Sequence, residues 1–263
     1  MDQFLSYKQG QIRFRDQGSG PAVIFLHGFL ESLDMWEEYT GRLSKAFRVI
    51  SIDLPGHGQS DCLGYVHPME VMAEAVKFVL DSLHLRRYIF IGHSMGGYVA
   101  LAFADRYPDQ MKGLCLFFST ARADTDQKKR DRARAIELVK ENHRSFIRKA
   151  IPLLFRPKNR KLFHAELKAL KAKALQTSKQ GVIASLEGMK IRPNREVILR
   201  FAPCPIFILA GKHDSVIPLE TLEPQMLLSE NGTGMVIEDC GHMGFIEAKE
   251  DCFMALSRFL RSC

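Results

Sequence analysis

The sequence lacks a hydrophobic run long enough for a transmembrane helix, which needs about 20 apolar residues. It also lacks an apolar leader, because its start, Met1-Asp2-Gln3-Phe4-Leu5-Ser6, contains an acid and no extended hydrophobic stretch. We therefore expect neither a membrane span nor a signal peptide, and we expect a cytoplasmic protein. The sequence has no repeat of the kind that forms fibres. Its content of 46% hydrophobic and 25% charged residues is ordinary for a globular chain.

Closely spaced cysteine pairs are also absent. The chain has no Cys-x-x-Cys motif, and its six cysteines are scattered at positions 62, 115, 204, 240, 252 and 263. Three of them lie in or beside apolar runs, so we expect reduced and mostly buried thiols rather than a disulfide framework. The nine histidines have no ligand-like spacing. The sequence thus predicts no metal site and no cofactor.

An even distribution of charge is lacking as well. Residues 122–200 contain 22 basic and 8 acidic residues, a net charge of +14, whereas the rest of the chain has 15 and 22, a net of −7. This asymmetry predicts a boundary near each end of the segment. The basic excess suggests an anionic substrate or surface, unless the side chains only solvate outer helix faces. Nucleic acid is not expected, because the segment has no interleaved aromatics and no recognition motif.

Short apolar runs bounded by turn residues occupy both ends of the chain. A hairpin is expected from residues 4–8 and 11–15. Further strands are expected at 22–26, 48–52, 88–91, 114–118, 205–210 and 234–237, and helices at 35–43, 68–83, 219–228 and 249–260. Strands that alternate with helices predict an α/β fold with a mostly parallel sheet, and the hairpin adds an antiparallel edge.

The middle of the chain has a different texture. Residues 121–202 contain no strand-like run, and helical patterns appear at 131–141 and 162–175. The segment coincides with the basic stretch, which supports its treatment as a separate unit. We predict a helical insertion at 121–202 between two parts of one core, 1–120 and 203–263.

The motif Gly92-His93-Ser94-Met95-Gly96 joins a predicted strand to a predicted helix. The apolar run 88–91 has the length of a buried strand, and the pattern after the motif is helical up to Tyr107-Pro108. The two glycines of the motif let strand and helix approach closely and expose the serine at the positive end of the helix. Ser94 is therefore the candidate nucleophile.

A serine nucleophile needs a base, and a histidine base works best when a carboxylate fixes its tautomer. His242 follows the last predicted strand, and Asp214 follows the strand at 205–210. Because strand ends meet at one edge of a parallel sheet, Ser94, Asp214 and His242 can converge although they are distant in the chain. Asp239 competes for the acid role. Asp214 is preferred because it directly follows a strand and leaves the base on a separate loop.

An acyl transfer also needs two preorganised donors for the developing oxyanion. The backbone N–H of Met95, next to the nucleophile, is one candidate. The other is the backbone N–H of Phe29, in the loop after an early buried strand. The Pro/Gly-rich loop 53–60 follows a strand end too, but we interpret Asp53 and His57 as parts of a rigid structural turn.

Five motifs occur in a fixed order: Leu26-His27-Gly28-Phe29, Asp53-Leu54-Pro55-Gly56-His57-Gly58-Gln59-Ser60, Gly92-His93-Ser94-Met95-Gly96-Gly97, Gly211-Lys212-His213-Asp214 and Gly241-His242. With them the chain resembles the α/β-hydrolase superfamily over essentially its whole length. The resemblance implies a doubly wound, mostly parallel eight-stranded sheet with a helical cap between strands six and seven. It also supports Asp214 as the acid and Phe29 and Met95 as the donors. A serine at 94 is unlike the dehalogenase and epoxide-hydrolase branches, which carry aspartate there.

We expect a carboxylesterase-like serine hydrolase that cleaves an ester of a small molecule through an acyl-enzyme intermediate. Similar folds with the same three side chains act as lyases or C–C bond hydrolases on diketo acids or polycarboxylates. This alternative gains weight if arginines of the insertion face inward. A non-catalytic ligand receptor is a third hypothesis, which the intact Ser, Asp and His set disfavours. No pattern predicts an oligomeric state.

Overall fold

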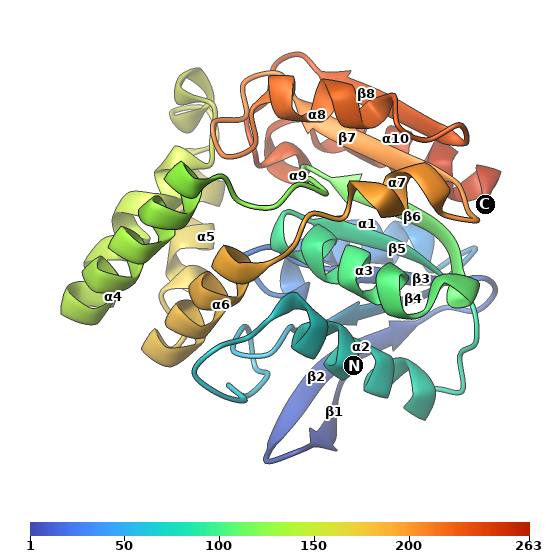
Figure 1. The fold of residues 1–263 in the computed structure, drawn as a ribbon, viewed down its shortest axis with the longest axis horizontal. Coiled ribbons are helices and arrows are strands. Elements are labelled where there is room, and N and C mark those ends of the chain that lie inside the picture. Colours follow the sequence, from blue (N-terminus) through green and yellow to red (C-terminus); the bar gives the residue numbers. More distant parts are fainter.

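The computed structural model describes residues 1–263 and is built on one eight-stranded sheet with the order β1-β2-β4-β3-β5-β6-β7-β8 (Figure 1). The strands are β1 (Asp2–Tyr7), β2 (Gly10–Gln17), β3 (Ala22–Leu26), β4 (Arg48–Ile52), β5 (Tyr88–His93), β6 (Met111–Phe117), β7 (Ile206–Gly211) and β8 (Gly232–Ile237). β1 and β2 form the expected antiparallel hairpin, and β2 pairs antiparallel with β4. All other pairs are parallel. The predicted mostly parallel α/β sheet is confirmed.

Helices cover both faces of this sheet, which explains why its central strands are apolar throughout. α2 (Met69–Ser82) and α3 (Met95–Arg106) lie in front of it, and α1 (Glu37–Leu43) and α10 (Lys249–Ser262) lie behind it in Figure 1. Every residue of β3, β5 and β7 is buried. On α10, the buried residues recur at helical spacing, and Phe259 stacks on Phe207 of β7 with 5.5 Å between ring centroids.

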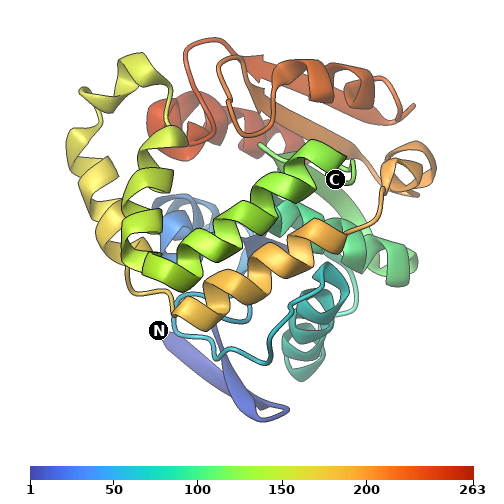
Figure 2. The same cartoon turned by 60° about the vertical axis from the view of Figure 1, so that its left-hand side comes forward.

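A helical insertion lies between β6 and β7. It consists of α4 (Asp126–Leu153), α5 (His164–Ala174), α6 (Lys179–Ile191) and α7 (Glu196–Phe201). Figure 2 shows α4 and α6 side by side. The side chain of Thr125 accepts from the Lys128 backbone N–H, and that of Ser178 accepts from the Gly181 N–H, so both helices begin at a capping residue.

Two helices differ from their predicted extent. α4 runs from 126 to 153 rather than from 131 to 141, and Asn142 within it has a non-helical backbone. Pro152 lies in its last turn instead of ending it earlier. α5 begins at His164, after a short 3₁₀ helix at Pro157–Arg160. None of the helices combines the length and the apolar character that crossing a bilayer requires.

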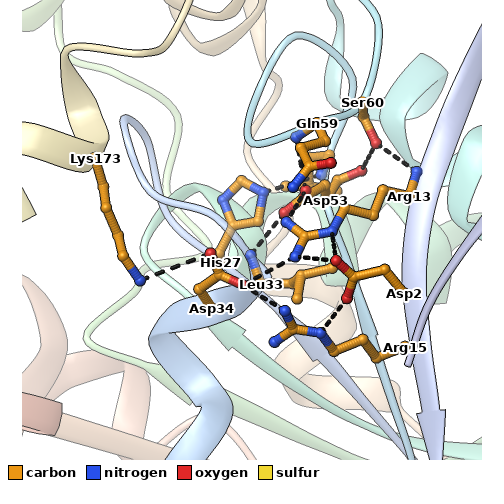
Figure 3. A network of polar contacts seen from close by, with 11 residues as sticks. Asp2, Arg13, Arg15, His27, Leu33, Asp34, Asp53, Gln59, Ser60 and Lys173 are labelled. Atoms are coloured by element: carbon orange, nitrogen blue, oxygen red, sulfur yellow. Dashed lines mark hydrogen bonds and ion pairs between the residues drawn. The ribbon is translucent and has the colours of Figure 1, made fainter.

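A buried carboxylate organises the loops at the carboxyl end of β4 (Figure 3). Asp53 Oδ1 accepts from the Leu33 backbone N–H at 2.7 Å, and Oδ2 accepts from the Gln59 N–H at 2.8 Å. Oδ2 also lies 3.1 Å from Nη1 of Arg13, whose side chain is buried on β2. The interpretation of Asp53 as a structural residue therefore agrees with its contacts.

Asp34 extends this network toward the insertion (Figure 3). Its Oδ1 accepts from Arg13 Nη2 at 3.1 Å, and its Oδ2 lies 3.6 Å from Nζ of Lys173 on α5. Burial raises the pKa of Asp34, but the charges of Arg13, Lys173 and Arg15 outweigh burial and hold the pKa below its usual value. Because Lys173 is exposed, this contact adds little to the stability of the fold and mainly orients the insertion on the core.

We expect Asp53→Ala to lower the free energy of unfolding by about 3–5 kcal/mol, because it removes the buried partner of Arg13 Nη1 and leaves the Leu33 and Gln59 backbone N–H groups without their acceptor. The matched control is Asp81→Ala, which removes the exposed partner of Lys77 on α2 and should cost about 0.5 kcal/mol or less. Chemical denaturation of both variants measures the difference. Equal losses would contradict a structural role for Asp53.

Candidate active site

β5 ends in a turn that positions Ser94. This residue has a φ of 48° and a ψ of −113°, a backbone conformation that residues other than glycine rarely adopt. Two glycines make the turn possible: a Cβ on Gly92 would lie 2.5 Å from the Gly96 carbonyl oxygen, and a Cβ on Gly96 would collide with the carbonyl oxygen of Leu26. The Ser119 hydroxyl, in the loop after β6, donates to the Ser94 carbonyl oxygen at 2.7 Å and fixes the turn.

The loops after β7 and β8 bring Asp214 and His242 together. His242 Nδ1 lies 2.6 Å from Asp214 Oδ2, and both side chains are buried. Asp214 Oδ1 accepts from the backbone N–H groups of Val216 and Ile217 at 2.7 and 2.9 Å, so the carboxylate cannot turn away from the imidazole. The competing acid, Asp239, points elsewhere.

Asp239 belongs to the surface of the molecule. Its side chain is 87% exposed and pairs with Arg156 Nη1 at 2.6 Å. Of the two acids that the sequence offers, Asp214 contacts His242, whereas Asp239 contacts Arg156.

Ser94 and His242 line the same pocket, which has a volume of about 90 Å³. Most of its wall is apolar: the core supplies Phe29, Tyr98 and Val216, and the insertion supplies Ile151 and Met189. The Ser94 residue is only 9% exposed, yet it reaches this space. No hydrogen bond joins its hydroxyl to the His242 imidazole, a contact that often tightens only when substrate binds.

The two expected oxyanion donors come from two different segments of the core. Phe29 lines the pocket from the loop after β3. Met95 is buried and is the first residue of α3, where backbone N–H groups have no acceptor inside the helix. The loop that carries Phe29 is held by the Gly28 N–H, which donates to Glu31 Oε2 at 2.6 Å.

Comparison with known proteins identifies the family. The family model described as the alpha/beta hydrolase fold matches residues 21–249. The chain belongs to the α/β-hydrolase family. A solved structure of a malate-bound thermophilic esterase from Thermogutta terrifontis is similar to this hydrolase with a TM-score of 0.92 and 32% identity, over 100% of this chain and 98% of that one.

Curated relatives of the hydrolase give a consistent picture. It is 28% identical over 264 residues to the AB hydrolase superfamily protein YisY of Bacillus subtilis, a match that covers 94% of each chain. It is 27% identical over 257 residues to a pimeloyl-[acyl-carrier protein] methyl ester esterase of Nitrosomonas europaea, covering 93% and 99%. An uncharacterised Mycobacterium tuberculosis protein is 37% identical over 103 residues, but that match spans only 30% of the relative. This hydrolase is therefore an enzyme, and its neighbours include esterases.

The hydrolase contains a buried ion pair that the sequence did not single out. Glu31 Oε2 lies 2.8 Å from His93 Nδ1, and both side chains are 1% exposed. His93 Nε2 donates to the backbone carbonyl oxygen of His242 at 3.1 Å. The pair thus links the loop that carries Phe29, the turn at the serine and the loop of the candidate base. The only sequence signal for this pair is the position of Glu31, two residues after Phe29.

The two partners shift each other's pKa. Burial lowers the pKa of His93, but the Glu31 charge and hydrogen bond outweigh burial and raise it above its ordinary value. Burial raises the pKa of Glu31, but His93 outweighs burial and lowers it below its ordinary value. Both groups are therefore charged between the two ordinary values, about 4.5 and 6.5.

We expect Glu31→Gln to lower the midpoint of thermal unfolding by about 10 °C near pH 6, because it leaves a buried cation unpaired. The contribution of His93 is lost as pH rises through its raised pKa, and that of Glu31 is lost as pH falls through its lowered pKa. The loss should therefore be smaller at pH 9 than at pH 6. Calorimetric scans at the two pH values measure it.

Glu37→Gln is the matched control, since it removes the same charge from an exposed position on α1. Its effect on the midpoint should be close to zero at both pH values. A loss for Glu31→Gln that does not change between pH 6 and pH 9 would refute the ion pair.

Proposed function

We propose that this α/β-hydrolase cleaves a carboxylic ester of a small molecule, with Ser94 as nucleophile, His242 as base and Asp214 as the group that orients the base. One observation carries the proposal: the 2.6 Å contact between His242 and Asp214 lies at a pocket that also receives Ser94 from a strained turn. A nucleophile, a base and an orienting acid at one pocket are the parts that acyl transfer requires.

The reaction proceeds in two steps. His242 Nε2 takes the proton of the Ser94 hydroxyl as Oγ attacks the carbonyl carbon, and the carbonyl electrons move onto oxygen. The backbone N–H groups of Met95 and Phe29 stabilise this oxyanion. Collapse expels the alkoxide, which receives the proton from His242 and leaves as the alcohol. A water molecule then gives a proton to His242 and attacks the acyl carbon. Collapse of this second tetrahedral intermediate returns the proton from His242 to Ser94 Oγ and releases the acid.

The helical insertion acts as a cap on this site. We assign residues 121–202 to the cap and residues 1–120 and 203–263 to the hydrolase core. Ile151 and Met189 reach the pocket from the cap, whereas the reacting groups all belong to the core. The core therefore supplies the chemistry, and the cap supplies much of the selection among substrates.

The comparisons favour ester hydrolysis over the lyase and C–C hydrolase hypotheses, although Arg132 of the insertion lines the pocket, as those hypotheses would require. The 32% identical neighbour that spans the whole chain is an esterase, and a full-length relative is a methyl ester esterase. Both of these enzymes are named as esterases, and ester cleavage takes place at a carbonyl carbon. The small pocket favours compact substrates over the drug-sized ligands that fill about 300–1,000 Å³.

We expect Ser94→Ala and His242→Ala to lower kcat on a short 4-nitrophenyl ester by about 10⁴-fold or more. Asp214→Asn should cost about 10⁴-fold, because the base then loses its tautomer and orientation. Asp239→Asn is the matched control for the acid and should leave kcat unchanged. A fluorophosphonate should label Ser94 and not Ser94→Ala. Full esterase activity in Ser94→Ala would disprove the assignment.

The pocket volume predicts a preference for short acyl chains. We expect kcat/KM to be highest for 4-nitrophenyl acetate to valerate and to fall at least about tenfold at decanoate, because longer chains must displace Ile151 or Met189. Ile151→Ala should shift the optimum to longer chains. A flat profile across these esters would show that the acyl chain does not enter this pocket.

A further inference from the structure

The pocket contains one cation that no part of the proposed reaction uses. Arg132, on α4, lines the pocket together with Ser94 and His242, and its side chain is 18% exposed. Most basic residues of the insertion are exposed on outer helix faces, so their charge is explained by solvation. Arg132 differs because it borders the space in which substrate would react.

A fixed support holds this guanidinium in place. Arg132 Nε donates to Asp124 Oδ2, and Arg132 Nη2 donates to Oδ1 at 3.3 Å. The Asp124 side chain is fully buried and also forms an ion pair with Arg192, whose Nη1 lies 2.7 Å from Oδ1. Such a backing fixes the direction of Arg132, as a subsite for a planar anion requires.

The cluster has more positive than negative charge. One carboxylate, Asp124, faces the guanidinium groups of Arg132 and Arg192. The Lys128 amine lies close enough to interact electrostatically with both guanidinium groups. Burial lowers the pKa of Lys128, and Arg132 lowers it further, which reflects this local surplus. Arg192 Nε is buried without any hydrogen-bond partner.

The remaining acids of the site do not remove the surplus. Glu31 is paired with His93, and even with the Asp214 charge included, Arg132, Arg192 and Lys128 face only two carboxylates. The Arg192 guanidinium lies 4.0 Å from the ring centroid of Tyr98, which lines the pocket, so its charge lies one side chain behind the pocket wall. A buried positive surplus beside an apolar pocket is costly unless an anion compensates it.

We propose that Arg132 is the binding residue for a carboxylate of the substrate, so that the preferred substrates are esters with a free carboxylate group. This inference rests on the proposed esterase function and specifies its substrate class. The carboxylate forms charge-assisted hydrogen bonds with the guanidinium N–H groups that Asp124 leaves free. Asp124 and Arg192 act behind Arg132 as positioning residues, and the apolar wall holds the neutral part of the ester.

The first test compares wild-type enzyme on matched substrates. Mono-4-nitrophenyl glutarate and 4-nitrophenyl valerate have acyl chains of equal length, and only the first carries a free carboxylate. A second pair, 4-acetoxybenzoate and 4-acetoxybenzamide, places the charge on the alcohol side. We expect kcat/KM for the anionic member of at least one pair to exceed that of its neutral partner by about tenfold or more.

The second test uses variants of Arg132. Arg132→Gln should reduce the preference for the anionic ester by about 10–100-fold, and Arg132→Lys should retain part of it because the charge remains. Arg134→Gln removes the same charge from the same helix at a side chain that is 68% exposed, and it should leave the preference unchanged. The comparison of Arg132→Lys with wild type decides the question even if Arg132→Gln folds poorly.

A binding measurement separates this inference from the proposed reaction. Calorimetric titration of glutarate into Ser94→Ala should detect binding, which Ser94→Ala with Arg132→Gln should lose. If wild-type enzyme prefers the neutral ester in both pairs, or Arg132→Gln changes both members of each pair equally, the carboxylate subsite is wrong and the esterase assignment stands. If glutarate binds through Arg132 but no ester turns over through Ser94, the subsite stands and the proposed reaction is wrong.

Discussion

The abrupt turn between β5 and α3 is the constraint on which the site depends. A backbone held at the φ and ψ of Ser94 costs roughly 1–3 kcal/mol in isolation. The surrounding structure offsets this cost, because β5 is buried along its whole length and α3 is buried from Met95 to Ala104. The turn also needs Gly96 against the backbone of Leu26. The helix that follows the nucleophile therefore packs directly against the end of the strand that precedes the donor loop.

A second feature of the structure is that several ionisable side chains are buried, each in contact with an ionisable partner. Asp53 with Arg13, Glu31 with His93 and Asp214 with His242 are all buried at the same edge of the sheet. In such surroundings each interaction is stronger than in water, and each unpaired partner is more costly. The rings of His93 and His242 lie 5.0 Å apart, so Glu31 also neutralises a charge beside the candidate base. The pairs thus give rigidity and a controlled electrostatic environment together.

Sequence reasoning predicted the core well because its strands are apolar runs with clear limits, and it placed Ser94, Asp214 and His242 on three neighbouring loops. The structure brings Asp214 against His242 and brings Ser94 to the same pocket. The predicted extent of α4 was wrong, because Asn142 interrupts its backbone next to the predicted end at 141. The partnership of Glu31 with His93 was not predicted, since it depends on packing between residues 62 positions apart. The direction of Arg132 was equally inaccessible, because a total charge does not specify which helix face meets the core.

The insertion leaves the core after β6 and returns at β7, and these two strands are neighbours in the sheet. Because β6 and β7 run parallel, the end of β6 and the start of β7 lie at opposite edges of the sheet, and the chain passes through α7 on its way back. The part of the insertion before α7 begins and ends side by side, since the Arg195 backbone N–H donates to the Ala121 carbonyl oxygen at 2.8 Å. The sheet therefore closes whether this part is long or short. Evolution can lengthen, shorten or exchange such a segment as a module while the pairing of the strands stays intact. New specificities can then arise by replacement of whole helices, without any intermediate in which the reacting groups are disturbed.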